Sequence, residues 1–310
     1  MEFFRIKHDI PFMSYGKITT AISLITFLLA IVFLLLRGLN LSMEFTGGTA
    51  LQVHYPHAAP LQDIRHRLAA FGTNLSVQQI NSVHEVQIKL PSNTKASSTQ
   101  SVEHCMALLK QGNTGVTLAS SSTIQPQVGS ELALQGIYVI LAVCVGIMLY
   151  LALRFEWRFA LSAIIANMHD IVIILGCFAY FQWEFSLTVL AGVLAVLGYS
   201  VNESVVVFDR IRENFKRPSM RKRPVAEIID NAITATISRT IITHGSTEAM
   251  VLSMLIFGGS VLHGFALALT IGIVFGIYSS VLVASPIVMA LGLSHHNLIK
   301  PPKIKQEAVV

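Results

Sequence analysis

The chain of 310 residues is 53% hydrophobic and only 13% charged, and its mean hydropathy is +0.62. Soluble domains carry about 25% charged residues, so this composition excludes an ordinary soluble protein and predicts a polytopic membrane protein. The net charge of +5 does not indicate nucleic-acid binding, because Lys and Arg gather beside apolar runs and no basic block is interleaved with aromatic residues.

An apolar run near the N-terminus, residues 18–36, is long enough to cross a bilayer. It is too long for the apolar core of a signal peptide, and no small-residue cleavage site follows it. We therefore interpret residues 1–37 as a cytoplasmic N-terminus followed by an uncleaved first transmembrane helix.

Residues 38–130 are more polar, and their patterns predict a folded α+β domain outside the membrane. Leu51, Val53 and Tyr55 fall on one face of a strand, and the apolar residues of 61–71 recur with the spacing of an amphipathic helix. The expected elements are strand 48–55, helix 61–71, strands 77–80 and 85–90, helix 102–109 and strand 116–124. This β-α-β-β-α-β order predicts a ferredoxin-like domain.

Five more apolar runs bring the predicted number of transmembrane helices to six. They are residues 132–153, 159–181, 186–208, 240–258 and 264–291. The expected division is helices 2–4 within 131–208, a basic cytoplasmic loop at 209–238, helices 5 and 6 within 239–292, and a cytoplasmic tail at 293–310. Fifteen of the 22 Lys and Arg lie near the N-terminus, in the turn 154–158, in the basic loop or in the tail. The positive-inside rule then places both termini in the cytoplasm and the domain outside.

The fourth predicted helix carries a carboxylate, Glu203, several residues inside the point where charge resumes at Asp209. A helix rises about 1.5 Å per residue, so this carboxylate lies roughly 8–10 Å within the apolar span. Ionised side chains are costly in hydrocarbon, and those that occur usually face a bundle interior and often mark proton or ion pathways. Arg239, at the start of the fifth helix, is the next such residue, and its permanent charge would tune the carboxylate without carrying a proton. The two predict a proton site; the alternative is a static ion pair that fixes helix packing.

Two further groups of intramembrane residues are candidates. Asp170, next to His169 in the third helix, either relays protons to Glu203 or makes a hydrogen bond between helices. His244 and Glu248 are four residues apart and share a face of the fifth helix. They form either a second protonatable pair or a neutral pair joined by a hydrogen bond.

The remaining motifs indicate structure rather than catalysis. Gly47 and Gly48 predict a tight turn or a close backbone approach where the first helix leads into the first strand, and no lysine of a nucleotide-binding loop follows them. Cys105, Cys144 and Cys177 lie far apart and predict neither a disulfide framework nor a metal site. We expect no enzymatic activity, no cofactor and no metal.

Several short motifs in this order resemble the SecF members of the SecD/SecF family of bacterial protein-export subunits, which are relatives of the resistance-nodulation-division transporters. The motifs are Glu44–Thr49 (EFTGGT) after the first helix, Val128–Leu132 (VGSEL) before the second, His169-Asp170 in the third, Gly198–Glu203 (GYSVNE) and Phe208–Asn214 (FDRIREN) in and after the fourth, and Ser238–Thr243 (SRTIIT) opening the fifth. The resemblance covers nearly the whole chain, and this combination of motifs and topology is highly specific.

The resemblance implies a SecD partner with a matching six-helix bundle. It also implies association with the Sec channel of SecY, SecE and SecG, with YajC or YidC as further partners. The implied activity is use of the proton-motive force to draw unfolded secretory proteins outward across the bacterial plasma (inner) membrane. Family members carry an acidic residue and an arginine implicated in proton movement at the positions of Glu203 and Arg239. The family commonly has Asp at the first of these, a small residue where this chain has His244, and an uncharged residue where it has Glu248.

Two other functions are consistent with parts of the sequence. One is half of a proton-driven small-molecule efflux transporter of the same superfamily. Such transporters usually carry larger outer insertions and several intramembrane acids in one chain, whereas here one insertion at 38–130 and six spans are predicted. The other is a purely structural subunit, against which the intramembrane Glu203 and Arg239 argue.

Overall fold

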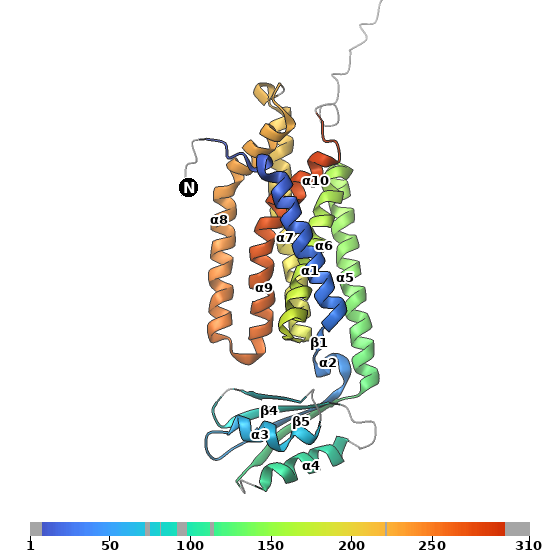
Figure 1. Ribbon diagram of the computed structural model, residues 1–310, viewed down its shortest axis with the longest axis vertical. Helices are drawn as coiled ribbons and strands as arrows, with labels where there is room; N and C mark the ends of the chain where they lie inside the picture. The colour runs from blue at the N-terminus through green and yellow to red at the C-terminus, as the bar shows by residue number, and fades with distance from the viewer. Residues whose placement is uncertain are drawn as a thin grey trace, which may run out of the picture.

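A bundle of six long helices stands on a small α+β domain in the computed structural model (Figure 1). The structure describes residues 8–71, 75–80, 82–91, 98–111, 115–220 and 222–294. The basic residues at 1–7, Arg221 and the predicted tail from residue 295 onward lie outside these ranges.

All six bundle helices are long and apolar enough to cross a membrane. They are α1 (Gly16–Arg37), which follows the 3-10 turn η1 (Phe12–Tyr15), α5 (Pro126–Arg154), α6 (Trp157–Phe181), α7 (Leu187–Lys216), α8 (Val225–Phe257) and α9 (Gly259–Ser279). The last continues through the π-helical segment η4 (Ser280–Ala284) into α10 (Ser285–Ala290). The prediction of a polytopic helical protein with six transmembrane helices is confirmed.

The segment 209–238, which the charge pattern predicts to be a loop, is mostly helical. Helix α7 continues to Lys216, η3 (Pro218–Met220) forms the turn, and α8 begins at Val225. Hydropathy marks the end of an apolar run, but a helix can continue into water where its charged side chains pair at helical spacing. Glu213 does so here, with Arg210 at 2.7 Å and Arg217 at 2.6 Å.

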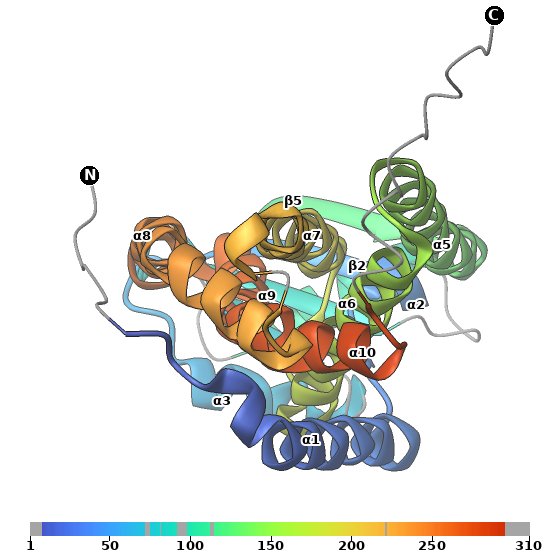
Figure 2. The same ribbon diagram turned by 90° about the horizontal axis from the view of Figure 1, so that it is seen from above.

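Helices α6, α7 and α9 lie at the centre of the bundle, with α1, α5 and α8 around them (Figure 2). The most apolar stretches of α6, α7 and α9 are 61%, 56% and 50% buried, against 11% for α1 and α5 and 17% for α8. The outer helices expose large apolar side chains such as Leu35, Leu153 and Phe257. These surfaces suit lipid or the helices of another membrane subunit.

The domain between α1 and α5 has the order of elements that the sequence predicts. Its elements are β2 (Gly48–His54), α3 (Leu61–Arg67), β3 (Ser76–Gln79), β4 (Glu85–Pro91), α4 (Ser98–Lys110) and β5 (Thr117–Ile124). The sheet order is β3-β4-β2-β5, and each neighbouring pair is antiparallel. Two β-α-β units are therefore interleaved, because each encloses one strand of the other.

Alternation along the strands gives the sheet two different faces. Val86, Ile88 and Leu90 of β4 are buried in a core shared with α3 and α4. Gln87 and Lys89 lie on the opposite face and line a hollow of about 500 Å³ between the sheet and the bundle. A second hollow of about 640 Å³ also contains Lys89 in its lining.

Backbone pairing and one ion pair join the domain to the bundle. Strand β1 (Asn40–Leu41) pairs in parallel with β6 (Glu184–Phe185), which lies in the turn between α6 and α7. Lys89 Nζ lies 2.6 Å from Glu184 Oε1, and Gln78 Nε2 donates to Glu184 Oε2 at 3.3 Å. The sheet is therefore fixed to the turn that precedes α7.

The Gly47-Gly48 pair forms the turn between the short helix α2 (Met43–Thr46) and β2. Both residues have positive φ angles, +75° at Gly47 and +152° at Gly48. A Cβ atom at Gly47 would lie 2.7 Å from the backbone of Pro126, and one at Gly48 would overlap the carbonyl oxygen of Leu90. The pair thus has a structural explanation in the close packing of this turn against α5 and β4.

We expect Gly48→Ala to lower the free energy of unfolding by about 2 kcal/mol or more, because it adds both a steric overlap and an unfavourable φ angle. Thermal unfolding of the detergent-solubilised protein measures this. Gly146→Ala in α5 is the matched control, since a Cβ there meets nothing within 4 Å. Equal melting temperatures for the two variants would contradict the structural explanation.

Burial raises the pKa of the Cys105 thiol to about 12. Because the thiolate is the reactive form, we expect iodoacetamide at pH 8 to modify Cys105 about 10²-fold or more slowly than an exposed cysteine. The measurement uses Cys144→Ala/Cys177→Ala protein, in which Cys105 is the single thiol. Ser121→Cys in a chain without native cysteines supplies the exposed reference in the same domain. Similar modification rates would show that Cys105 is not buried.

Candidate functional site

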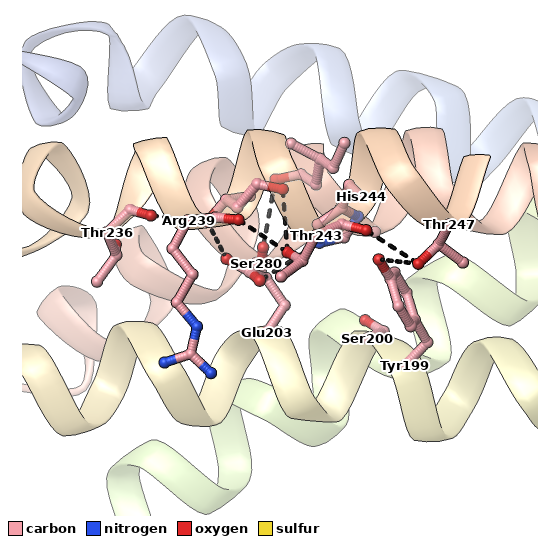
Figure 3. A network of polar contacts seen from close by, with 12 residues as sticks. Tyr199, Ser200, Glu203, Thr236, Arg239, Thr243, His244, Thr247 and Ser280 are labelled. Carbon is pink, nitrogen blue, oxygen red and sulfur yellow. Dashed lines mark hydrogen bonds and ion pairs between the residues drawn. The ribbon is translucent and has the colours of Figure 1, made fainter. Parts of the chain in front are cut away.

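Helix α7 carries Glu203, and the structure buries this carboxylate so that it is 5% exposed. Its Oε1 accepts a hydrogen bond from Thr240 Oγ1 at 2.5 Å, and its Oε2 lies 3.3 Å from His244 Nε2 (Figure 3). Thr240 and His244 are four residues apart on α8, so they present adjacent turns of one helix face to α7. Both oxygens of the buried carboxylate are therefore engaged by a single neighbouring helix, which offsets the cost of removing them from water.

An aromatic side chain of α7 holds the imidazole in place. Tyr199 packs against His244 in an edge-on arrangement, with ring centroids 4.7 Å apart. Its hydroxyl lies 3.3 Å from Thr247 Oγ1, one turn farther along α8. His244 is itself only 2% exposed, so the ring is enclosed between the two helices.

A second buried carboxylate, Asp170 of α6, is 1% exposed. Its Oδ2 accepts hydrogen bonds from Ser200 of α7 at 2.8 Å and from Ser279 of α9 at 2.7 Å. Its Oδ1 lies 3.3 Å from His169 Nδ1, and His169 Nε2 lies 2.7 Å from Ser23 Oγ of α1. Asp170 therefore joins four helices of the bundle through hydrogen bonds.

Small residues allow α9 to approach α7 closely enough for this arrangement. A Cβ atom at Gly272 would overlap the side chain of Val196, and one at Gly192 would lie 3.1 Å from the carbonyl oxygen of Phe265. One turn beyond Gly272, Gly276 faces Ser200. This close contact brings serine hydroxyls of both helices onto the same oxygen of Asp170.

The predicted pairing of Arg239 with Glu203 is not present in the structure. Arg239 is exposed, no ion pair in the described part of the chain includes it, and its guanidinium lies outside the hydrogen bonds drawn around Glu203 (Figure 3). The reason is helical geometry, because neighbouring residues of a helix point about 100° apart. Thr240 points at Glu203, so Arg239 cannot share that face.

His244 also makes a contact that the sequence did not predict, with Glu203. His244 Nε2 contacts Glu203, while His244 Nδ1 and Glu248 Oε2 are both buried and have no hydrogen-bond partner among the described residues. A shared helix face predicts that His244 and Glu248 lie near each other, but it gives no sign of the partner on α7.

Several side chains that bind the buried carboxylates or a neighbouring histidine were not identified from the sequence. Thr240 could have been found from its four-residue spacing to His244, once that face was assigned to α7. Ser23, Ser200 and Ser279 could not, because serine is common in membrane helices and each partner lies on a different helix. No group of three or more His, Cys, Asp or Glu in the described ranges is arranged to hold a metal ion.

Comparison with known proteins relates the chain to protein-export subunits. The family described as "Protein export membrane protein SecD/SecF, C-terminal" matches residues 104–294, and the "SecD/SecF GG Motif" matches residues 32–55. The protein translocase subunit SecF of Haemophilus influenzae is 38% identical over 96% of this chain and 90% of its own length. The SecF subunit of Vibrio alginolyticus is 39% identical over 99% of this chain and 97% of its own length.

A solved structure gives the same relationship. The crystal structure of SecDF from Thermus thermophilus, described as a translocon-associated membrane protein, superposes with a TM-score of 0.80 at 34% identity. The match covers 93% of this chain but only 39% of the SecDF chain. SecDF in its super-membrane-facing form superposes with a TM-score of 0.72.

We expect Asp170→Leu to lower the free energy of unfolding in detergent by about 2 kcal/mol or more, because it leaves the buried groups of His169, Ser200 and Ser279 without their acceptor. Thermal unfolding measures the change. Asp209→Asn, at an exposed position of α7, is the control. A loss no larger than that of the control would show that the Asp170 hydrogen bonds contribute little to stability.

Proposed function

The chain belongs to the SecD/SecF family of protein export membrane proteins, and we propose that it acts in the Sec protein translocase as a SecF-type subunit. In this role it promotes protein export across the bacterial inner membrane together with SecD. The names of the relatives and the likeness to SecDF support an export role. The match covers 39% of the SecDF chain, and the proposed SecD partner would correspond to the part of SecDF that this chain does not match.

We propose that both termini lie in the cytoplasm and that the α+β domain lies outside. The start of α1, the basic turn Arg154–Arg158 and the connection between α7 and α8 are at one end of the bundle, and the domain is at the other (Figure 1). Concentration of Lys and Arg at the first end supports its cytoplasmic placement.

We propose that protonation of Glu203 couples the proton-motive force to export. The observation that carries this proposal is a buried carboxylate whose two oxygens are both engaged by α8, an outer helix with little buried surface. Charging or neutralising Glu203 changes what it can accept from Thr240 and His244, so the two protonation states favour different contacts between α7 and α8. Such a difference in stability is what shifts a conformational equilibrium.

Arg239 and Asp170 take separate roles in the proposal. The exposed guanidinium of Arg239 lies on α8, one residue before the Thr240 that donates to Glu203, and is free to pair with a carboxylate of the SecD bundle. Asp170, held by serines of α7 and α9, is a second protonatable group next to α7, the helix that carries Glu203. The comparisons name export subunits, so they favour this function over small-molecule efflux.

We expect Glu203→Gln and Arg239→Ala each to abolish the gradient-dependent part of protein export while the protein still inserts with SecD. The measurement is translocation of a secretory precursor into inverted membrane vesicles, with and without an imposed proton gradient. Glu227→Gln and Arg223→Ala are matched controls, because they remove the same charges at the exposed start of α8. Wild-type stimulation by the gradient in both test variants would rule out the proposed coupling site.

A further inference from the structure

We propose that His244 carries protons between Glu203 and Glu248 and so extends the proton path by one turn along α8. This inference rests on the proposed role of Glu203 as a protonatable group. It gives His244 a transfer function beyond its contact with Glu203, and it adds Glu248, which the coupling proposal does not use. The imidazole contacts Glu203 on one side and, within the part of the chain that the structure describes, has a nitrogen without a partner on the other.

One nitrogen of His244 contacts Glu203. His244 Nε2 lies 3.3 Å from Glu203 Oε2, and the ring is almost completely buried. Tyr199 packs its ring edge-on against the imidazole, and the Tyr199 hydroxyl is held by Thr247. The imidazole is thus kept between α7 and α8 with one nitrogen directed at the carboxylate.

The other nitrogen of the His244 ring has no partner in the described ranges. His244 Nδ1 is buried without a hydrogen-bond partner among the described residues, and so is Oε2 of Glu248. These two residues lie four apart and therefore on adjacent turns of the same helix face. Buried polar atoms rarely stay unpaired, and a single water molecule can bridge two of them. The geometry points to a connection between His244 Nδ1 and Glu248, direct or through one water molecule.

The imidazole can pass a proton from Glu203 to Glu248. Neutral imidazole accepts at one nitrogen and donates from the other. A protonated Glu203 gives its proton to Nε2 while Nδ1–H gives its proton to ionised Glu248. Afterwards Glu203 is ionised, His244 is neutral with the proton on Nε2, and Glu248 is protonated. One O–H and one N–H bond have broken and one of each has formed, so charge and atoms balance. A change of tautomer returns the ring to its starting state.

Among the described residues, few titratable groups lie near this route. From α7, Glu203 and Tyr199 face the imidazole. On α8, Arg239 lies five residues earlier and is exposed. The titratable residues of α9 lie elsewhere, since His263 lines the hollow beside the domain and the Tyr278 hydroxyl donates to Thr19 of α1. Helix α10 and η1 contribute no charged side chain to this region.

The direction of the path follows from the direction of α8. This helix starts at the basic end of the bundle and ends next to the domain (Figure 1). Glu248 lies one turn nearer the domain than His244, at a half-buried position. Protons would therefore pass between the middle of the bundle and the domain-facing end of α8.

The test is proton flux into liposomes that contain the wild-type or variant protein co-purified with SecD, recorded with an internal pH-sensitive dye. His244→Gln retains a side-chain N–H for Glu203 but cannot relay a proton, and we expect flux to fall about 10²-fold, as in other sites that lose an acid–base group. Glu248→Gln should cause a similar loss. Glu227→Gln, on the same helix, should keep wild-type flux.

Chemical rescue separates proton transfer from a structural role. His244→Ala leaves space for a small molecule, and added imidazole should restore a measurable fraction of the flux to this variant but not to His244→Gln. Full flux in both His244→Gln and Glu248→Gln, with flux lost in Glu203→Gln, would overturn the relay and leave the coupling role of Glu203 standing. Full flux in Glu203→Gln as well would overturn both. A third outcome is that His244→Ala loses flux, imidazole does not restore it, and Glu248→Gln keeps normal flux. That result would assign His244 a purely structural role and overturn the relay.

Discussion

The cost of burying a charge among apolar helices determines the architecture of this bundle. Glu203 and Asp170 are both almost completely buried, and each is stable there only because neighbouring helices supply donors. Helix α7 is involved in both cases, since it carries Glu203 and contributes Ser200 to Asp170. The central position of α7 in the bundle follows from its contacts with both carboxylates. The glycines that let α9 approach α7 closely help to supply donors to Asp170.

The two carboxylates differ in how firmly they are held. Asp170 accepts hydrogen bonds from α7 and α9, which are themselves well buried, and its histidine neighbour reaches α1. Glu203 depends on α8, whose apolar stretch is only 17% buried. The contact that holds Glu203 is therefore the one that a neighbouring subunit could alter by displacing α8. The α7–α8 contact is therefore better suited to the switching role proposed for Glu203 than the hydrogen bonds of Asp170 are.

The sequence predicted those features that depend on the polarity of individual residues. Hydropathy located all six helices, alternation located the strands, and the rarity of intramembrane carboxylates singled out Glu203 and Asp170. Sequence reasoning failed where the outcome depends on which side chains meet across helices. Arg239 is adjacent in sequence to the donor Thr240 and yet lies on another face, and the contact of His244 with Glu203 was not predicted. Such contacts depend on helix rotation and separation, which a composition pattern does not encode.

The helix that carries Glu203 also begins at the attachment of the domain. The first turn of α7 is capped by Ser186, and the backbone N–H of Leu187 donates to Glu44 next to the glycine turn. Two residues before the cap, Glu184 holds Lys89 of the sheet. A helix of seventeen residues spans about 25 Å, so Glu203 and this attachment are two ends of one rigid element. A change in the α7–α8 contact that tilts α7 therefore moves the domain with it, because the domain has no comparable ion pair to α8 or α9 in the described part of the chain. In this way the protonation proposed for Glu203 would have a mechanical connection to the α+β domain.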